Sequence, residues 1–329
     1  MDMLHRRGST LLVVAFCGLA LHAAIARPQA QDESEVKVRT WLESGPVEEC
    51  VDVLFVGDGY TRRQLARKYW TDVNRCAKRF FHEPPFSWYK SRFNVRAALV
   101  VSKDAGCRRD PADDSVSTAF GSFFDSATGR LLVFGNSEAL AATVRAAGPA
   151  DIVIVMVNTE RYGGGGSTLG EIQVRGRPLP APTFSAQDTT SFLIAIHELG
   201  HSFARLADEY EDVANHDRYP LPNQGDIDCM NVTLASRVDS SSRERLRQTL
   251  KWSHFLDLKR AGRHAWVHDG GYFRASGVLR PWPTCLMRDH QDPFCPVCCE
   301  EVTIAIFATC GMQFDDEAYH KAHSLTLWR

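Results

Sequence analysis

Two histidines four residues apart constrain this chain more than any other feature of its sequence. His197-Glu198-Leu199-Gly200-His201 lies in an apolar stretch that predicts a helix beginning at Ser191. Residues four apart project from the same face of a helix, so both imidazoles can reach one metal ion, as a zinc site requires. Glu198, between them, can take a proton from a zinc-bound water. The motif therefore predicts a helix that holds a metal ion and a general base.

Asp208 and Glu209 are the nearest acidic candidates for a third metal ligand. In a continuous helix Asp208 would lie about 10 Å beyond His201 along the axis, whereas a zinc–oxygen bond is about 2 Å long. If Asp208 binds the metal, the helix must end within residues 203–206 and the chain must turn back. Glycine would make that turn easy, but the sequence has Ala204-Arg205 there. Asp208 is the expected third ligand, and Glu209 or a later carboxylate is the alternative.

Short apolar runs alternate with helical patterns before this motif. Strands are predicted at residues 51–56, 94–101, 131–134 and 151–157, and helices over 61–83, over 137–147 and from residue 191. Strands that alternate with helices favour a mixed α/β sheet. The pattern is weak between residues 212 and 284, where only 243–255 predicts a helix, and Pro296 begins a final helix that runs to Cys310.

The first residues are typical of a signal peptide rather than of the fold. An apolar run from Leu11 to Leu21 is too short to span a membrane, and Ala24-Ile25-Ala26 predicts cleavage after residue 26. Residues 27–40 are polar and predict a flexible leader. A lipid anchor on Cys17 is the alternative, but bulky Phe16 precedes it. We therefore expect a protein that is secreted or periplasmic.

Charge and composition exclude other partners. The net charge of -2 offers nothing to attract nucleic acid or an anionic membrane surface. Hydrophobic residues make up 44% of the chain, but no stretch after the signal peptide is long and apolar enough to span a bilayer. We expect neither nucleic acid nor a stable membrane anchor.

The cysteines allow two interpretations. Loss of Cys17 with the signal peptide leaves nine of the ten, and five of these lie near the end of the chain, at positions 285, 295, 298, 299 and 310. Cys285 and the cluster Cys295-Pro296-Val297-Cys298-Cys299 could form a structural zinc site. Export favours a disulfide instead, and no particular pairing follows from the sequence.

Beyond the short motif, the segment from His197 to Tyr210 resembles the signature of the bacterial immunoglobulin-A metalloprotease family of metzincin-like zinc peptidases. Three other segments also resemble this family: Val56–Thr61, Asn158 through the following glycines, and Cys285 through Cys298. The resemblance extends over about residues 45–311. One departure is Arg205, which stands where members usually carry glycine.

This resemblance implies a role for each matching residue. His197 and His201 match the zinc ligands, Glu198 the catalytic glutamate and Asp208 the acidic third ligand. Met287 matches the methionine of a turn, the Met-turn, that lies beneath the metal. His290, close to Met287 in sequence, is the only other histidine that we expect beside the site.

The resemblance also implies a fold. We expect an α/β (α+β) zincin-like domain over residues 41–329, with a mixed twisted β-sheet packed by helices. An N-terminal subdomain would cover residues 41–207 and include the active-site helix with the His-Glu-x-x-His motif. An irregular, Cys-rich C-terminal subdomain with the Met-turn would cover residues 208–329.

The expected function is that of a secreted zinc metalloendopeptidase with one catalytic zinc ion and a polypeptide substrate. The cleft of such an enzyme needs a strand edge along which an extended peptide can pair, and Gly163, Gly164 and Gly165 are our candidates. A flexible loop without function is the alternative for these glycines. For the whole chain, the alternatives are a zinc hydrolase that acts on a non-protein amide and a non-catalytic binding module. An intact Glu198 argues against the binding module.

Overall fold

The computed structural model describes residues 36–212, 214, 216–257 and 266–323. The predicted signal peptide, Cys17 and the first part of the predicted leader lie outside these residues. The leader is shorter than predicted, because Val38–Leu42 forms strand β1 and pairs with β3. The predicted division at residues 207 and 208 stays a prediction.

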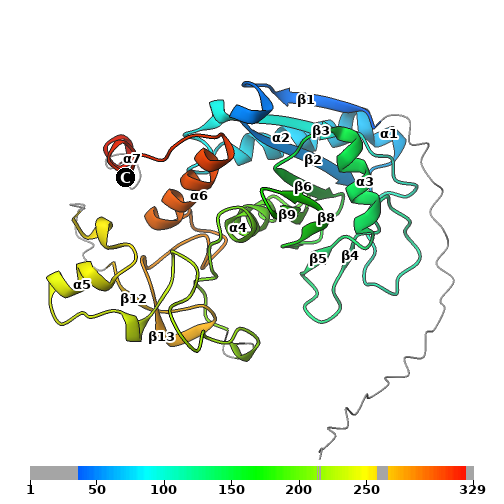
Figure 1. Cartoon of the computed structure of the whole chain (residues 1–329). Helices are drawn as coiled ribbons and strands as arrows, with labels where there is room; N and C mark the ends of the chain where they lie inside the picture. Colours follow the sequence, from blue (N-terminus) through cyan, green and yellow to red (C-terminus); the bar gives the residue numbers. More distant parts are fainter. Residues whose placement is uncertain (1–35, 213, 215, 258–265, 324–329) are drawn as a thin grey trace, which may run out of the picture. The chain divides into compact units, whose positions relative to one another are not determined.

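A mixed, six-stranded sheet is the centre of the fold (Figure 1), with the strand order β1-β3-β2-β6-β10-β7. Strands β3, β2, β6 and β10 are parallel, and the two outer strands are antiparallel to their neighbours. The strands of the chain are β1 (Val38–Leu42), β2 (Val51–Asp58), β3 (Phe93–Ala98), β4 (Phe123–Phe124), β5 (Leu132–Val133), β6 (Ile152–Val157), β7 (Gly164–Gly165), β8 (Thr168–Val174), β9 (Arg177–Pro180), β10 (Thr183–Ser185), β11 (Thr233–Leu234), β12 (His268–Gly271) and β13 (Arg274–Arg280).

Helices cover both faces of this sheet. The α-helices are α1 (Arg62–Gln64), α2 (Trp70–Phe80), α3 (Ser137–Ala147), α4 (Phe192–Ser202), α5 (Arg243–Thr249), α6 (Pro296–Thr309) and α7 (Asp316–His323). Apolar side chains of α2, α4 and α6 share one core with alternate residues of β2, β3 and β6. Helix α3 and the β8–β9 hairpin pack against the opposite face. The mixed sheet packed by helices confirms the predicted α+β class.

The sequence patterns located the main elements because these elements carry strong apolar periodicity. Helix α3 has the predicted bounds, and Asn136 and Gly148 cap its two ends. The helix predicted to start at Thr61 is α1, a π-helical turn at Leu65–Tyr69, and α2 in succession. The sequence pattern did not predict β8, β9 or the strands after α4, because these strands are short or largely exposed.

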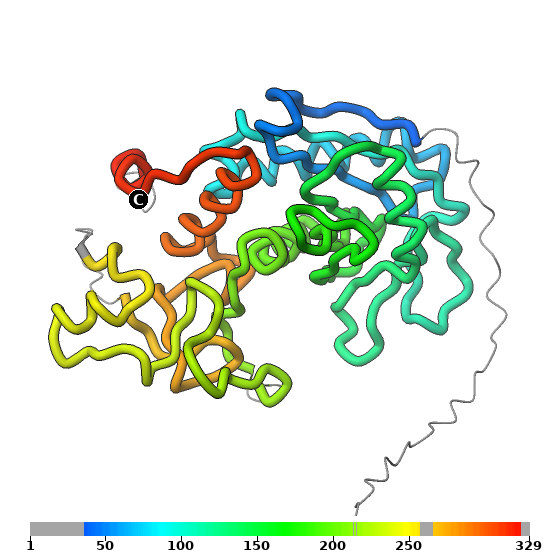
Figure 2. The backbone as a smooth tube through the Cα atoms, in the orientation of Figure 1, coloured from blue at the N-terminus to red at the C-terminus, as the bar shows by residue number. Residues whose placement is uncertain are grey.

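The chain after α4 follows a mainly irregular path before it reaches β12, β13 and α6 (Figure 2). Strands β11, β13 and β12 form a small separate antiparallel sheet. The predicted helix at 243–255 divides into α5 and a 3-10 turn at Ser253–Asp257. Within the described residues, no helix is both long and apolar enough to cross a membrane.

Candidate metal centre

Helix α4 holds the two histidines on a rigid support. Before its first turn, the Asp188 carboxylate accepts hydrogen bonds from the backbone N–H groups of Thr190 and Ser191. One side of the helix is buried in the core through Ala195, Ile196 and Leu199, which are 0–1% exposed. The histidines lie on the face that lines the cleft. The Nε2 atoms of His197 and His201 are 3.1 Å apart, as the spacing of four residues predicts.

The helix ends where the third ligand requires it to end. Phe203 is its C-cap, and Arg205 takes a left-handed conformation with φ of +58°. The Leu206 N–H then donates to the carbonyl of Gly200, which turns the chain back over the last turn of α4 (2.9 Å). The predicted break is therefore confirmed, and an arginine takes the conformation that glycine would adopt without strain.

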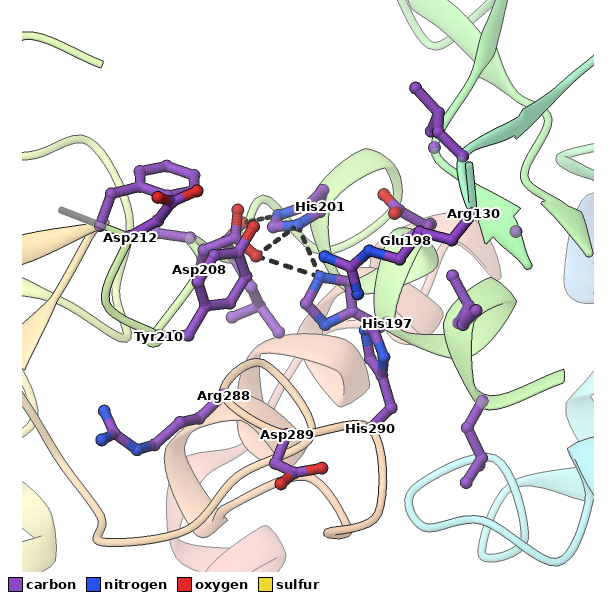
Figure 3. A pocket seen from close by; sticks show the side chains of 18 of the residues that line it. Arg130, His197, Glu198, His201, Asp208, Tyr210, Asp212, Arg288, Asp289 and His290 are labelled. Atoms are coloured by element: carbon purple, nitrogen blue, oxygen red, sulfur yellow. Dashed lines mark hydrogen bonds and ion pairs between the residues drawn. The ribbon is translucent and has the colours of Figure 1, made fainter. Parts of the chain in front are cut away.

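This reversal brings Asp208 to both histidines. Asp208 Oδ1 lies 3.0 Å from His197 Nε2 and 3.2 Å from His201 Nε2, and Figure 3 shows the three side chains pointing toward one another. Glu209, the alternative ligand, lies elsewhere: its side chain is fully buried and contacts Asn231 and Cys298. The structure therefore favours Asp208 over Glu209 at the histidines.

Backbone carbonyls fix the orientation of both imidazoles. His197 Nδ1 lies 2.9 Å from the carbonyl oxygen of Leu286, and His201 Nδ1 lies 2.7 Å from that of Leu206. A carbonyl can only accept, so in each neutral imidazole Nδ1 carries the hydrogen and Nε2 has the lone pair that can bind a metal. Metal-binding histidines commonly have such a second partner.

The charges of the group suit a cation. Burial alone would lower the pKa of His201, but the Asp208 carboxylate outweighs burial and the pKa lies at about 9. Burial alone would raise the pKa of Asp208, but the imidazoles of His197 and His201 hold it well below its usual range. The carboxylate is therefore anionic and turned toward the two Nε2 atoms, where a metal cation can take the place of a proton.

Donor separations provide a second test of whether these residues fit a metal. The three donor atoms lie 3.0, 3.1 and 3.2 Å from one another. Two ligands of a tetrahedral zinc ion, each bonded at about 2.0–2.1 Å, lie about 3.3 Å apart. The three residues therefore fit a metal ion without rearrangement of the backbone.

Met287 lies directly beneath α4. It is fully buried, and a Cβ atom added to Gly200 would come within 2.5 Å of its Sδ. The carbonyl of Met287 accepts the N–H of Glu209 at 2.7 Å. The turn that contains Leu286 and Met287 thus contacts both the metal-ligating helix and the segment after Asp208, as the resemblance to a Met-turn implies.

Glu198 lies beside the three donors and lines the same cleft. The exposed Gly166 lies against its carboxylate, since a Cβ atom added to Gly166 would collide with Glu198 Oε2. The fourth glycine of the loop therefore limits where the Glu198 carboxylate can lie.

The predicted peptide edge at Gly163, Gly164 and Gly165 needs correction. All three glycines are buried, and β7 pairs with β10 on one side. On the other side Gly164 pairs with Leu131. Added Cβ atoms at these positions would collide with neighbouring atoms. A Cβ atom added to Gly163, for example, would lie 2.5 Å from the carbonyl oxygen of Arg130. These glycines permit close backbone packing, and the open part of the loop begins at Gly166.

The cleft around the site is large, with a volume of about 1250 Å³. It also contains residues that the sequence analysis did not single out, among them Arg130, Tyr210 and Arg288 (Figure 3). Tyr210 and Arg288 lie within two of the resembling segments, Tyr210 two residues after Asp208 and Arg288 directly after Met287, which was the available signal. His290, the expected neighbour, lies with its ring 4.7 Å from that of His197, and burial lowers its pKa to about 4.

The cysteines differ from the favoured expectation. All nine cysteines of the described residues are free thiols, so the expected disulfide is absent from this part of the chain. Cys285 Sγ and Cys298 Sγ lie 3.6 Å apart, whereas bonded sulfur atoms lie about 2.05 Å apart.

Two histidines and an aspartate that converge in a cleft beside a glutamate are typical of metal-dependent hydrolases. The family model described as IgA Peptidase M64 matches residues 40–258. The chain therefore belongs to the IgA Peptidase M64 family, which confirms the resemblance noted in the sequence and makes the chain a peptidase by family. No curated protein matches the chain. The matched range ends before Met287 and the last five cysteines, so their interpretation depends on the geometry.

Proposed function

We propose that this chain is an exported zinc-dependent endopeptidase that holds its ion through His197, His201 and Asp208. The observation that carries the proposal is the convergence of their three donor atoms, within 3.2 Å of one another, beside the Glu198 carboxylate in an open cleft. Three protein ligands with an accessible fourth position are the usual arrangement of a catalytic zinc site.

The donor set favours zinc over other common ions. Two imidazole nitrogens and one carboxylate oxygen suit zinc, whereas calcium and magnesium prefer oxygen ligands alone. When bound, a zinc ion would polarise a peptide carbonyl and make water nucleophilic near neutral pH.

Glu198 is the proposed general base and acid. It would accept a proton from the attacking water, hold it on the carboxylate, and deliver it to the leaving amine. Gly166, packed against the Glu198 carboxylate, would keep that carboxylate beside the metal ligands. The carbonyls of Leu286 and Leu206 would keep both imidazoles in the metal-binding orientation.

The size of the cleft supports a polypeptide substrate. Pockets for small ligands usually measure about 300–1,000 Å³, and this cleft of about 1250 Å³ is larger and open. The exposed Gly166 lies at its margin and is the revised candidate for pairing with an extended peptide. An amide that is not part of a protein would leave most of this space unused.

The signal-peptide pattern of residues 1–26 supports secretion or a periplasmic location. Such a location would give the enzyme access to proteins outside the cytoplasm.

Digestion of a panel of denatured proteins, with and without a metal chelator, tests the proposal. We expect cleavage that stops in the chelator and returns when zinc is added. Cleavage that continues after metal removal would contradict the role of the metal. Hydrolysis of small amides without any cleavage of proteins would favour the amide hydrolase, and tight binding of proteins without hydrolysis would favour the binding module.

A further inference from the structure

A second group of metal-ligating side chains lies in the core, separate from the three cleft donors. Glu209, Cys285, Cys295 and Cys298 each offer one ligand atom, and these four atoms all lie within 4.8 Å of one another. Each of the four residues is 0% exposed. The group is therefore closed to solvent, whereas the histidine group opens into the cleft.

The separations between ligand atoms in this group match those of a tetrahedral zinc site. Cys285 Sγ and Cys298 Sγ are 3.6 Å apart, and Cys298 Sγ lies 3.3 Å from Glu209 Oε1. With zinc–sulfur bonds of about 2.3 Å and zinc–oxygen bonds of about 2.0 Å, tetrahedral geometry puts sulfurs about 3.8 Å apart and sulfur and oxygen about 3.5 Å apart. The backbone N–H of Cys295 also donates to Cys285 Sγ at 3.2 Å, which would stabilise a thiolate there.

The buried, incompletely paired carboxylate of Glu209 points to a cation. Its Oε1 accepts a hydrogen bond from the Asn231 amide at 3.0 Å, but its Oε2 is buried without any hydrogen-bond partner. The Arg280 guanidinium, which acts on Glu209 through its charge, donates instead to the carbonyls of Asp269 and Gly270. A buried carboxylate that stays ionised needs a paired charge or a metal ion, and the three neighbouring cysteines can supply the other ligands of such an ion.

A disulfide would not satisfy this group. Any bond between two of the three cysteines would leave one thiol and the Glu209 carboxyl group buried together, with Glu209 Oε2 still without a hydrogen-bond partner. A metal ion uses all four groups at once. Cys299 takes no part in the group, because its Sγ lies against the carbonyl of Phe294.

The local sequence also suits a zinc site. Cys295 is the N-cap of α6 and Cys298 lies in its first turn, so the pair has the two-residue spacing common among structural zinc ligands. The amino end of a helix favours thiolates. Together with the Arg280 guanidinium, it would offset the excess negative charge of three thiolates and a carboxylate.

We propose that Glu209, Cys285, Cys295 and Cys298 bind a structural zinc ion. This ion would join the segment after Asp208, the turn at residues 285–288 and the start of α6. The same turn supplies the Leu286 carbonyl to His197 and packs Met287 under Gly200. The buried ion would therefore fix the floor of the cleft without taking part in hydrolysis.

Metal analysis of a variant without the cleft donors tests this site independently of the proposed peptidase activity. In His197→Ala/His201→Ala we expect a single zinc ion per chain, with sulfur dominating its X-ray absorption fine structure. The sulfur-specific measurement is needed because His254, Glu300, Asp316 and His320 form another group of possible ligands. Zinc with only nitrogen and oxygen ligands, or no zinc, would overturn the proposal.

Cysteine variants in the same background identify the ligands. Adding Cys295→Ser/Cys298→Ser should remove the sulfur-bound zinc. The control Cys107→Ser should retain it, because the Cys107 thiol contacts the carbonyls of Arg108 and Ser122 and none of the four proposed ligands. Should the double serine variant not fold, alkylation of the folded wild-type protein replaces it. We expect Cys285, Cys295 and Cys298 to be protected until zinc is removed, and a disulfide between any two of them would overturn the proposal.

Discussion

Asp208 and Glu209 are neighbours in the sequence, yet they belong to two groups of opposite character. Asp208 joins two histidines at the surface of a large cleft, and Glu209 joins three cysteines in the core. The backbone between them turns so that consecutive carboxylates reach different groups. A single short segment after α4 can therefore support both chemistry and structure.

The difference between the groups lies in their donors and in their access to solvent. The cleft group has nitrogen and oxygen donors and an open side, which leaves room for water and substrate. The core group has mainly sulfur donors and is closed on all sides, which suits an ion that stabilises the fold. Variants that affect one group and spare the other test this contrast.

Asp208→Ala should have the largest effect on activity. The variant loses an atom that would bind the metal directly. Loss of a residue that only hydrogen-bonds a metal ligand costs about 10–100-fold in affinity, so we expect the affinity of the cleft for zinc to fall by more than about 100-fold. Sulfur-bound zinc and the folded structure should remain. Zinc titration and peptidase assays check both expectations, and unchanged binding in the cleft would mean that another residue is the third ligand.

Glu209→Gln should instead reduce stability. Structural zinc contributes about 10–16 kcal/mol in small zinc-binding peptides, so loss of one of four ligands should lower the free energy of unfolding by several kcal/mol. Denaturant unfolding measures this change. If the group holds no metal, replacing a buried carboxylate by a neutral amide should leave stability unchanged or increase it, which would remove the contrast between the two groups.

Gly166→Ala should reduce catalysis while both metal groups stay intact. The added methyl group would displace the Glu198 carboxylate, and a misplacement of about 1 Å can cost about 100-fold in rate. Gly170→Ala is the matched control, since an added Cβ there has no neighbour within 4 Å. Equal rates for the two variants would show that Gly166 does not position the base.

Arg205→Gly should have the smallest effect. Arg205 adopts a left-handed conformation with φ of +58°, which costs about 1–2 kcal/mol for a residue with a Cβ atom. Its ion pair with Asp228 is exposed and contributes little. We expect the free energy of unfolding to rise by about 1 kcal/mol, with the zinc content unchanged. A loss of stability in thermal or denaturant unfolding would assign the arginine a larger role.

Local rules were sufficient to predict the two histidine donors of the cleft and the helix break that a third donor requires. The spacing of His197 and His201 fixes their separation on a helix, and the short zinc–oxygen bond requires the helix to break before Asp208. The family resemblance then indicated that Met287 lies beneath the metal site. The sequence could not decide between Asp208 and Glu209, because that choice depends on the turn at Arg205 and on the position of Asn231, which lies beyond the reach of any local rule.

Long-range packing explains the predictions that were wrong. The glycines at 163–165 suggested an open edge, but Arg130, Thr183 and Ile194 from three other segments bury them. Export suggested a disulfide among the last cysteines, but the fold brings Glu209 to three of them. Neither contact leaves a signature in the sequence next to the residues that it affects.

Glu198→Gln tests the central claim most directly, because it changes the proposed base and leaves the three cleft donors in place. General acid–base catalysis contributes about 10²–10⁴-fold to rate. We therefore expect the peptidase rate to fall by about that factor while zinc content and thermal stability match those of the wild type. Wild-type activity in a variant with full zinc content would contradict the account.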